Sequence, residues 1–249
     1  MKSGLLKLKV CGLVLGWLTT AMTLNGKDPE EKKEEELPAS ILFVNAVLDP
    51  GLAFLVIDEV DANPAGFSAG LVTGWVQFPA GEREIEVEHQ PLGKVVVDKE
   101  LKAGSRQAFI AYKVMEDQSA KGRPLKPTIG VLRLACDEQE KVPAGKRRVV
   151  LVNTTMREEV AVEVGDENVV LKRLKPESVV TAMGGGFIVV KPIEEKATEE
   201  PGVESEVLVL TTLNVEEPVV SYVVIYEKAE GGLGAVTFAG LGSRSDEKD

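Results

Sequence analysis

Short apolar runs, separated by Gly, Pro, Asn and Asp, make up most of the chain from Ile41 onward. The segment Glu84 to Glu88, with the sequence EIEVE, alternates strictly between acidic and apolar residues. A period of two places the apolar side chains on the buried face of a strand and the carboxylates on its solvated face. No stretch shows a sustained helical period. The pattern therefore predicts an all-β protein.

The apolar runs predict seven strands in each half of the chain. In the first half they span Ile41–Leu48, Ala53–Ile57, Gly74–Phe78, Arg83–His89, Lys94–Leu101, Gln107–Met115 and Gly130–Ala135. In the second half they span Arg148–Thr155, Val160–Val164, Val179–Ala182, Phe187–Lys191, Glu206–Leu213, Val219–Glu227 and Gly234–Phe238. Short strands in these numbers are typical of an antiparallel, Ig-like β-sandwich.

The stretch Ile41 to Asp58 is similar to Val149 to Asp166. Aligned without a gap, the two place Val44-Asn45 on Val152-Asn153, Ala53 on Ala161, Val56 on Val164 and Asp58 on Asp166, at a constant offset of 153 − 45 = 108. Such self-similarity predicts two internal repeats. We expect tandem sandwich units over 40–137 and 148–239, joined by a polar linker over 138–147. Separate domains and one fused sandwich both fit this pattern.

The first residues have the composition of a targeting signal. Three lysines precede the apolar run Val10–Leu18, and the small residues Thr19, Thr20 and Ala21 follow it. This order predicts a signal peptide over 1–21 and an exported protein, in the periplasm or at the cell surface. The apolar run is too short to span a bilayer, and an uncleaved N-terminal anchor is the alternative.

Charged residues dominate two further segments. Residues 22–39 contain GKDPEEKKEEE, which predicts an acidic disordered tether, and residues 240–249 predict a disordered tail. The whole chain of 249 residues carries a formal net charge of −11. This acidity disfavours nucleic acid and anionic lipid surfaces as partners, because both attract basic patches. An envelope protein or a glycan is the partner class left open, as is the oligomeric state.

Turn and strand signatures occur in a defined order along the first half. Val44-Asn45-Ala46 and Asp49 come first, Phe78-Pro79-Ala80-Gly81 and Leu101-Lys102-Ala103-Gly104 each precede a strand, and Pro143-Ala144-Gly145-Lys146 leads into Val152-Asn153. In this order the chain resembles the bacterial domain of unknown function 4397. The resemblance covers Ile41 to Asn153 and fades after it, where Leu174-Lys175-Pro176 replaces the expected Pro-Ala-Gly turn. It implies an exported, β-rich, internally repeated protein and brings no catalytic residues.

Few residues could carry catalysis. His89 is the only histidine, and its inward position favours a partly buried residue at a strand end over a general base. Cys136 is the only cysteine after the predicted signal peptide, which favours a buried apolar role over a disulfide, with dimerisation through it as the alternative. These two residues form the one possible nucleophile–base pair, and no spacing singles out two carboxylates. We therefore expect no enzyme and no cofactor.

Two segments resemble binding sites. Asp58, Asp61 and Asn63 form an oxygen-rich turn that could hold calcium, although it lacks the spacing of an EF-hand loop. Local turn hydrogen bonds by these side chains are the alternative. The triple glycine Gly184–Gly186 precedes a strand-like FIVV and lacks the lysine of a phosphate-binding loop.

Aromatic residues gather before the acidic strand. Trp75, Phe78 and Phe67 could form a surface on which sugars or peptides stack, or Trp75 could pack between sheets. Taken together, the sequence predicts an exported, non-catalytic β-sandwich protein that acts as a cell-envelope binding or scaffolding module. A purely structural envelope protein and a carbohydrate-active enzyme are the alternatives.

Overall fold

The computed structural model describes residues 37–118, 124–136, 142–182, 187–191, 208–212, 220–228 and 232–240. They all belong to one compact unit, Glu36–Asp249. Their regular structure consists of strands, so the predicted all-β class is confirmed. Within these ranges there is no helix of the length and apolarity needed to cross a membrane. The predicted signal peptide, most of the tether and the tail, and Gly184–Gly186 lie outside the described residues.

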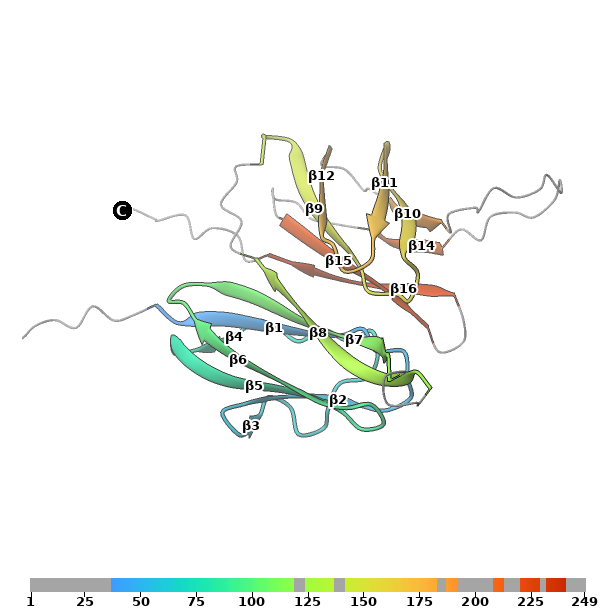
Figure 1. Ribbon diagram of the computed structural model, residues 1–249. Coiled ribbons are helices and arrows are strands. Elements are labelled where there is room, and N and C mark those ends of the chain that lie inside the picture. The colour runs from blue at the N-terminus through green and yellow to red at the C-terminus, as the bar shows by residue number, and fades with distance from the viewer. Residues whose placement is uncertain are drawn as a thin grey trace, which may run out of the picture. The chain divides into compact units, whose positions relative to one another are not determined.

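Sixteen strands are present in the described residues (Figure 1). The first half contains β1 (Ala39–Asn45), β2 (Ala53–Ile57), β3 (Val60–Asp61), β4 (Val76–Phe78), β5 (Gly81–His89), β6 (Gly93–Leu101), β7 (Arg106–Glu116) and β8 (Lys126–Ala135). The second half contains β9 (Lys146–Asn153), β10 (Glu159–Val164), β11 (Glu167–Lys172), β12 (Glu177–Ala182), β13 (Phe187–Lys191), β14 (Leu208–Thr212), β15 (Val220–Glu227) and β16 (Leu233–Ala239).

The described strands form four sheets of four strands each. In the first half the orders are β4-β1-β7-β8, here the β1 sheet, and β3-β2-β5-β6, here the β2 sheet. In the second half the orders are β12-β9-β15-β16, the β9 sheet, and β11-β10-β13-β14, the β10 sheet. Adding eight to each strand number of the first pair of sheets gives the second pair.

The sheets are not purely antiparallel, which corrects the sequence prediction. β1 pairs with β7 in parallel, and β9 pairs with β15 in parallel. Parallel neighbours require a long crossover connection. In the first half that crossover includes β2, β5 and β6, which form most of the β2 sheet.

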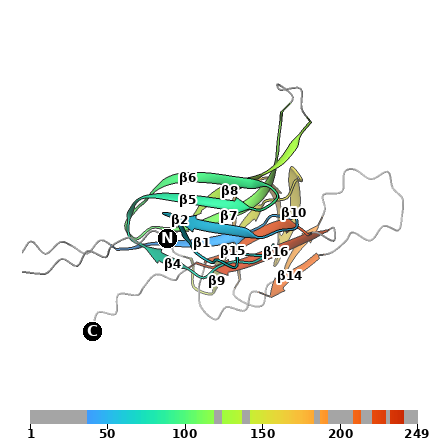
Figure 2. The same ribbon diagram turned by 90° about the horizontal axis from the view of Figure 1, so that it is seen from below.

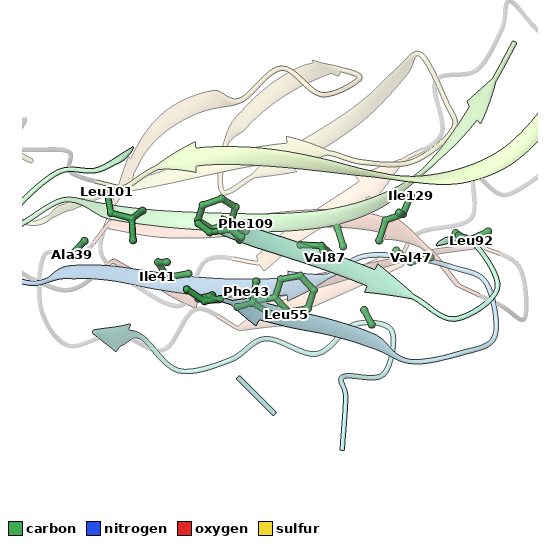
Figure 3. Packing of buried hydrophobic residues seen from close by; sticks show 14 residues of the cluster. Ala39, Ile41, Phe43, Val47, Leu55, Val87, Leu92, Leu101, Phe109 and Ile129 are labelled. Atoms are coloured by element: carbon green, nitrogen blue, oxygen red, sulfur yellow. The ribbon is translucent and has the colours of Figure 1, made fainter. Parts of the chain in front are cut away.

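Each half contains its own apolar core between two sheets. In the first core, Phe43 of β1 and Phe109 of β7 meet Leu55 of β2 and Val87 of β5 (Figure 3). The second core is built in the same way and includes Leu151 of β9 and Val162 of β10. Apolar side chains at alternate positions of each strand line these cores, as the alternating patterns predict.

A third cluster, here the central core, lies between the β1 sheet and the β9 sheet. Its buried members are Leu42, Val44, Ala46, Ala108, Ile110, Leu134, Cys136, Val150, Val152, Tyr222, Val224, Val236 and Phe238. All seven residues of β1 are buried, because its two faces line two different cores. This explains why Ile41–Val44 of β1 and Val149–Val152 of β9 are continuous apolar runs in the sequence rather than alternating ones.

The β1 sheet and the β9 sheet contribute side chains of different size to the central core. Leu42 of β1 is in register with Ala108, and Val150 of β9 is in register with Tyr222. Ala108 in turn pairs with Leu134, whereas Tyr222 pairs with Phe238. The second half therefore presents two large aromatic rings where the first half presents smaller side chains. Such size complementarity is what close packing requires.

Two edge strands, β3 and β11, were missed by the pattern. Ile57 pairs with Val60 across the two-residue turn Asp58-Glu59, whose φ angles of 49° and 66° are those of a type I′ hairpin turn. β11 was not predicted because it lies at a sheet edge, where Val170 is 51% exposed and the alternation of apolar and polar residues is weak. The predicted acidic turn is thus the start of a hairpin.

The gapless alignment of the halves holds at Asn45 and Asn153 but fails beyond them. Val56 is half-buried on the outer side of β2, whereas Val164 is buried in the second core. Because neighbouring residues of a strand face opposite sides, these two valines are not equivalent. Ile57 and Val164 each precede a two-residue hairpin turn, at an offset of 164 − 57 = 107. The connection after Asn45 is therefore one residue longer than the connection after Asn153.

Candidate functional site

The Val-Asn pairs that first indicated similarity have a structural role. Asn45 is fully buried; its Oδ1 accepts the Val47 N–H at 3.0 Å, and its Nδ2 donates to the Phe67 carbonyl at 2.8 Å. Asn153 is also fully buried, and its Oδ1 accepts the Thr155 N–H at 3.0 Å. Each asparagine satisfies the backbone where the chain leaves the central strand of a sheet.

The three aromatic candidates are divided between two cores. Phe67 and Phe78 pack against the first core, and the Phe67 ring lies 5.4 Å from that of Phe43. Trp75 packs against the central core, where its ring lies 6.4 Å from Phe238, and its Nε1–H donates to the Ala239 carbonyl at 3.0 Å. The position of Trp75 agrees with the alternative of a residue packed between sheets.

Of the calcium candidates, Asn63 makes a local turn hydrogen bond, whereas Asp58 bonds to the neighbouring strand β5. Asp58 Oδ2 accepts from Arg83 at 2.7 Å, and its Oδ1 accepts the Glu84 N–H at 3.2 Å. The Arg83 hydrogen bond lowers the pKa of Asp58. Asn63 Oδ1 accepts the Ala65 N–H at 3.1 Å, and Asp61 is exposed in β3. Across the described residues there is no group of three or more His, Cys, Asp or Glu side chains that could hold a metal ion.

Cys136 and His89 lie at opposite ends of β7. Cys136 is 5% exposed, belongs to the central core, and its N–H donates to the Arg106 carbonyl at the start of β7. His89 lies beside Asp49, which pairs with Lys113 near the other end of β7. Arg106 and Lys113 are 113 − 106 = 7 residues apart, about 23 Å along a strand. The structure therefore does not bring this nucleophile–base pair together.

A polar cluster, here the end cluster, consists of Asp49, Gly51, His89 and Lys113. It forms where the β1–β2 loop (residues 46–52) packs against the last residue of β5 and against β7. Lys113 Nζ lies 2.8 Å from Asp49 Oδ2, and both side chains are about three-quarters buried, at 23% and 24% exposure. His89 is fully buried. The extra residue of the first half lies in the connection that holds this cluster.

Equivalent positions in the second half carry different chemistry. Lys113 pairs with Ile129 across the β7–β8 ladder, and Glu227 pairs with Leu233 across the β15–β16 ladder. Glu227 Oε1 accepts the Met156 N–H at 3.3 Å, so it also contacts the loop after the first strand of its half. A lysine–aspartate ion pair in one half is thus replaced in the other by a hydrogen bond from the main chain to a carboxylate.

Lys113 also connects the two halves. Its carbonyl accepts from Arg173 Nη2 at 3.2 Å, and Arg173 Nε donates to the Thr155 carbonyl at 2.8 Å. Nearby, a Cβ on Gly70 would collide with the Tyr226 hydroxyl. The end cluster therefore lies next to a contact between halves.

A second polar feature, here the acidic face, is the outer side of the β5–β6 hairpin. It carries Glu82, Glu84, Glu86, Glu88 and Glu100. Glu82 lies directly opposite Glu100, so two carboxylates share one cross-strand position. Lys94 Nζ pairs with Glu86 Oε2 at 2.7 Å. In Figure 2, β5 and β6 are long neighbouring strands, and the sequence alternation predicted this face correctly.

The ion pair of the end cluster was not identified from the sequence. Asp49 and Lys113 are 113 − 49 = 64 residues apart, and no local pattern links them. A comparison with family models and with curated proteins finds no match to this chain.

Proposed function

We propose that this protein is an exported, non-catalytic binding module of the cell envelope, built from two Ig-like sandwich repeats. The proposal includes the predicted signal peptide over residues 1–21 and the resemblance to the domain of unknown function 4397. The partner is a cationic surface of an envelope protein or glycan, which the acidic face contacts.

Three correspondences support the two repeats. The four sheets have matching strand orders, and Asn45 and Asn153 make matching hydrogen bonds. In each half a tyrosine ring lies over the glycine opposite it on the neighbouring strand: Tyr112 over Gly130, and Tyr226 over Gly234. An aromatic ring that covers a cross-strand glycine is a known device of sheet stability.

The observation that carries the binding proposal is the charge of the acidic face. Glu82 and Glu100 lie directly opposite each other on β5 and β6. Like charges in this position destabilise an antiparallel pair of strands. Carboxylates that are not neutralised within the fold are available to cationic groups of a partner. Val96, which is 46% exposed on the same hairpin, adds apolar contact area. Complementary charge of this kind governs association rate and partner choice.

The absence of catalysis in this proposal is supported by the positions of the reactive side chains. The Cys136 thiol belongs to the central core, and His89 is buried at the far end of β7. The end cluster combines a carboxylate, an ammonium group and a neutral imidazole, with no hydroxyl or thiol nucleophile among its four members.

The test is capture from a solubilised envelope fraction of the producing cell. The immobilised wild-type protein is compared with the double variant Glu84→Lys/Glu88→Lys. We expect the reversal to reduce capture at least about tenfold, equivalent to about 1.4 kcal/mol. The matched control, Glu167→Lys/Glu177→Lys, makes the same change of charge on β11 and β12 and should capture as the wild type does.

Two outcomes would contradict the proposal. Equal capture by the wild type and the Glu84→Lys/Glu88→Lys variant would remove the acidic face from binding. If no component is retained by any of the three proteins, the purely structural alternative becomes the better account.

A further inference from the structure

His89 is enclosed by small residues and by a loop. It is the last residue of β5, and its cross-strand neighbours are Ala53 on β2 and Gly93 on β6. Gly51 of the β1–β2 loop lies directly against the ring: a Cβ there would be 3.2 Å from His89 Cε1 and 2.9 Å from the Cδ of Pro91. The φ of Gly51, 143°, is also one that other residues rarely adopt. The loop therefore needs glycine at this position to close over the imidazole.

The closed site favours a neutral imidazole. Within the described residues, the Asp49 main chain is the one hydrogen-bonding group that acts on the ring, and its geometry is too poor for a regular hydrogen bond. Burial lowers the pKa of His89 below its ordinary value, and the Asp49 carboxylate and main chain offset this only in part. A charged group in such a place lacks the solvation that water would give it.

The charged groups around His89 are few. The β1–β2 loop contributes Asp49, and β7 contributes Lys113, which holds the Asp49 carboxylate at 2.8 Å. On β5, the acidic residues before His89 belong to the acidic face on the opposite side of the sheet, and Lys94 of β6 pairs with Glu86 there. The turn between β5 and β6, Gln90-Pro91-Leu92, has no titratable side chain.

We propose that His89 is a pH-dependent switch: when its ring takes up a proton, the β1–β2 loop, residues 46–52, opens away from the β5–β6 turn. β5 is held in place, because it is hydrogen-bonded to β2 on one side and to β6 on the other. The loop is bonded to β7 at its start, where Ala46 N–H donates to the Ala111 carbonyl at 2.9 Å. Beyond that point it is held by the Asp49–Lys113 ion pair and by a 3.4 Å hydrogen bond from Gln90 N–H to the Leu52 carbonyl.

Opening of the loop has a defined structural consequence. Val47 is fully buried and Leu92 is 6% exposed, and both belong to the first core. An open loop exposes this end of the core to solvent and frees Asp49 from Lys113. The second half has no histidine, so the switch is specific to the first half.

The direction of the pH effect follows from the pKa of His89 in the closed and open states. In the closed state the pKa of His89 is below its ordinary value of 6.5. In the open state the ring is in water, so its pKa returns to that value. At a pH between these two pKa values the open state binds more protons than the closed state. The population of the closed state is therefore largest at high pH and decreases as the pH falls. The fraction of open loops should rise by up to tenfold for each pH unit below about 6.5, until the pKa of the closed state is reached.

The test is hydrogen exchange of the full-length protein from pH 7.5 to pH 5, corrected for the intrinsic exchange rate. We expect the protection of amides in residues 46–52 to fall by up to tenfold per pH unit below about 6.5. Protection in residues 154–158, the corresponding loop of the second half, should not change. Since His89 is the only histidine, its ring protons can be followed by NMR in the same samples without ambiguity.

Variants separate the switch from a general loss of stability. His89→Gln keeps a neutral polar side chain and should remove the pH dependence of the loop. Lys113→Gln retains His89 and leaves the Asp49 carboxylate without its cation. The unpaired carboxylate should stabilise the protonated ring in the closed state, so loop protection should depend less steeply on pH than in the wild type. The proposal is overturned if loop protection is independent of pH in the wild type, or if His89→Gln shows the same dependence. It is also overturned if Lys113→Gln makes loop protection depend more steeply on pH than in the wild type.

Discussion

Removal of the Phe238 ring should weaken the contact between the two halves of the protein. Phe238 is 8% exposed in the central core. Its ring stacks on Tyr222 at 5.0 Å, with an interplanar angle of 8°, and meets Trp75 of the first half edge to face at 6.4 Å. Phe238→Ala therefore deletes the ring that links the aromatic side chains of both halves.

The expected loss of stability is large. A buried phenylalanine truncated to alanine costs about 3–5 kcal/mol, and each aromatic pair contributes about 0.5–1.5 kcal/mol of that. With a urea m-value of about 3 kcal/mol/M, such a loss lowers the unfolding midpoint by about 1–1.7 M. The control Val170→Ala changes a side chain that is 51% exposed in the same half and should cost less than about 0.5 kcal/mol.

The assay follows two signals in a chain that begins at Met22. In that chain Trp75 is the only tryptophan, so its fluorescence reports the contact between the halves, whereas far-UV circular dichroism reports all sheets. In the wild type the two transitions should coincide. In Phe238→Ala both midpoints should fall, and the fluorescence transition should come first. A midpoint shift no larger than that of Val170→Ala would refute the role of the central core.

Three further predictions concern the surface and the N-terminus. Millimolar calcium should leave the melting temperature unchanged, because Asp58 is already bonded to Arg83; a rise of several degrees that Asp61→Ala abolishes would show a calcium site. Glu100→Lys should stabilise the fold by about 0.2–1 kcal/mol in urea titrations at low salt, since it converts a like-charge pair into an opposite one; a loss of stability would contradict this. N-terminal sequencing of the exported protein should begin between Met22 and Lys27, and a chain that retains Met1 would exclude cleavage.

Several features of the fold could be predicted from the sequence because they depend on local patterns. The alternation in EIEVE placed Ile85 and Val87 in the first core and the glutamates outside. Strand β11 could not be identified in this way, since an edge strand has little burial to impose a pattern. The parallel pairing of β1 with β7 was also missed, because the order of strands in a sheet is set by long-range packing.

The end cluster could not be predicted from the sequence either, because it also depends on long-range packing. The inward position of His89 was correctly inferred, but its burial depends on a loop that ends 89 − 52 = 37 residues earlier, a separation that no sequence period encodes. The one-residue difference between the halves was hidden by a chance match of Asp58 with Asp166. The burial of Val164, which contrasts with the outer position of Val56, and the hairpin turns after Ile57 and Val164 show that the extra residue lies between Asn45 and Ile57.

Retention at the envelope in the producing cell tests the proposed function most directly. The wild-type gene is replaced by one that encodes Glu84→Lys/Glu88→Lys, and cells are fractionated after a wash at low salt. We expect the wild type to stay with the envelope fraction and the variant to move to the soluble exported fraction, while Glu167→Lys/Glu177→Lys is distributed as the wild type is. The same distribution for all three proteins would contradict an acidic face that binds an envelope partner.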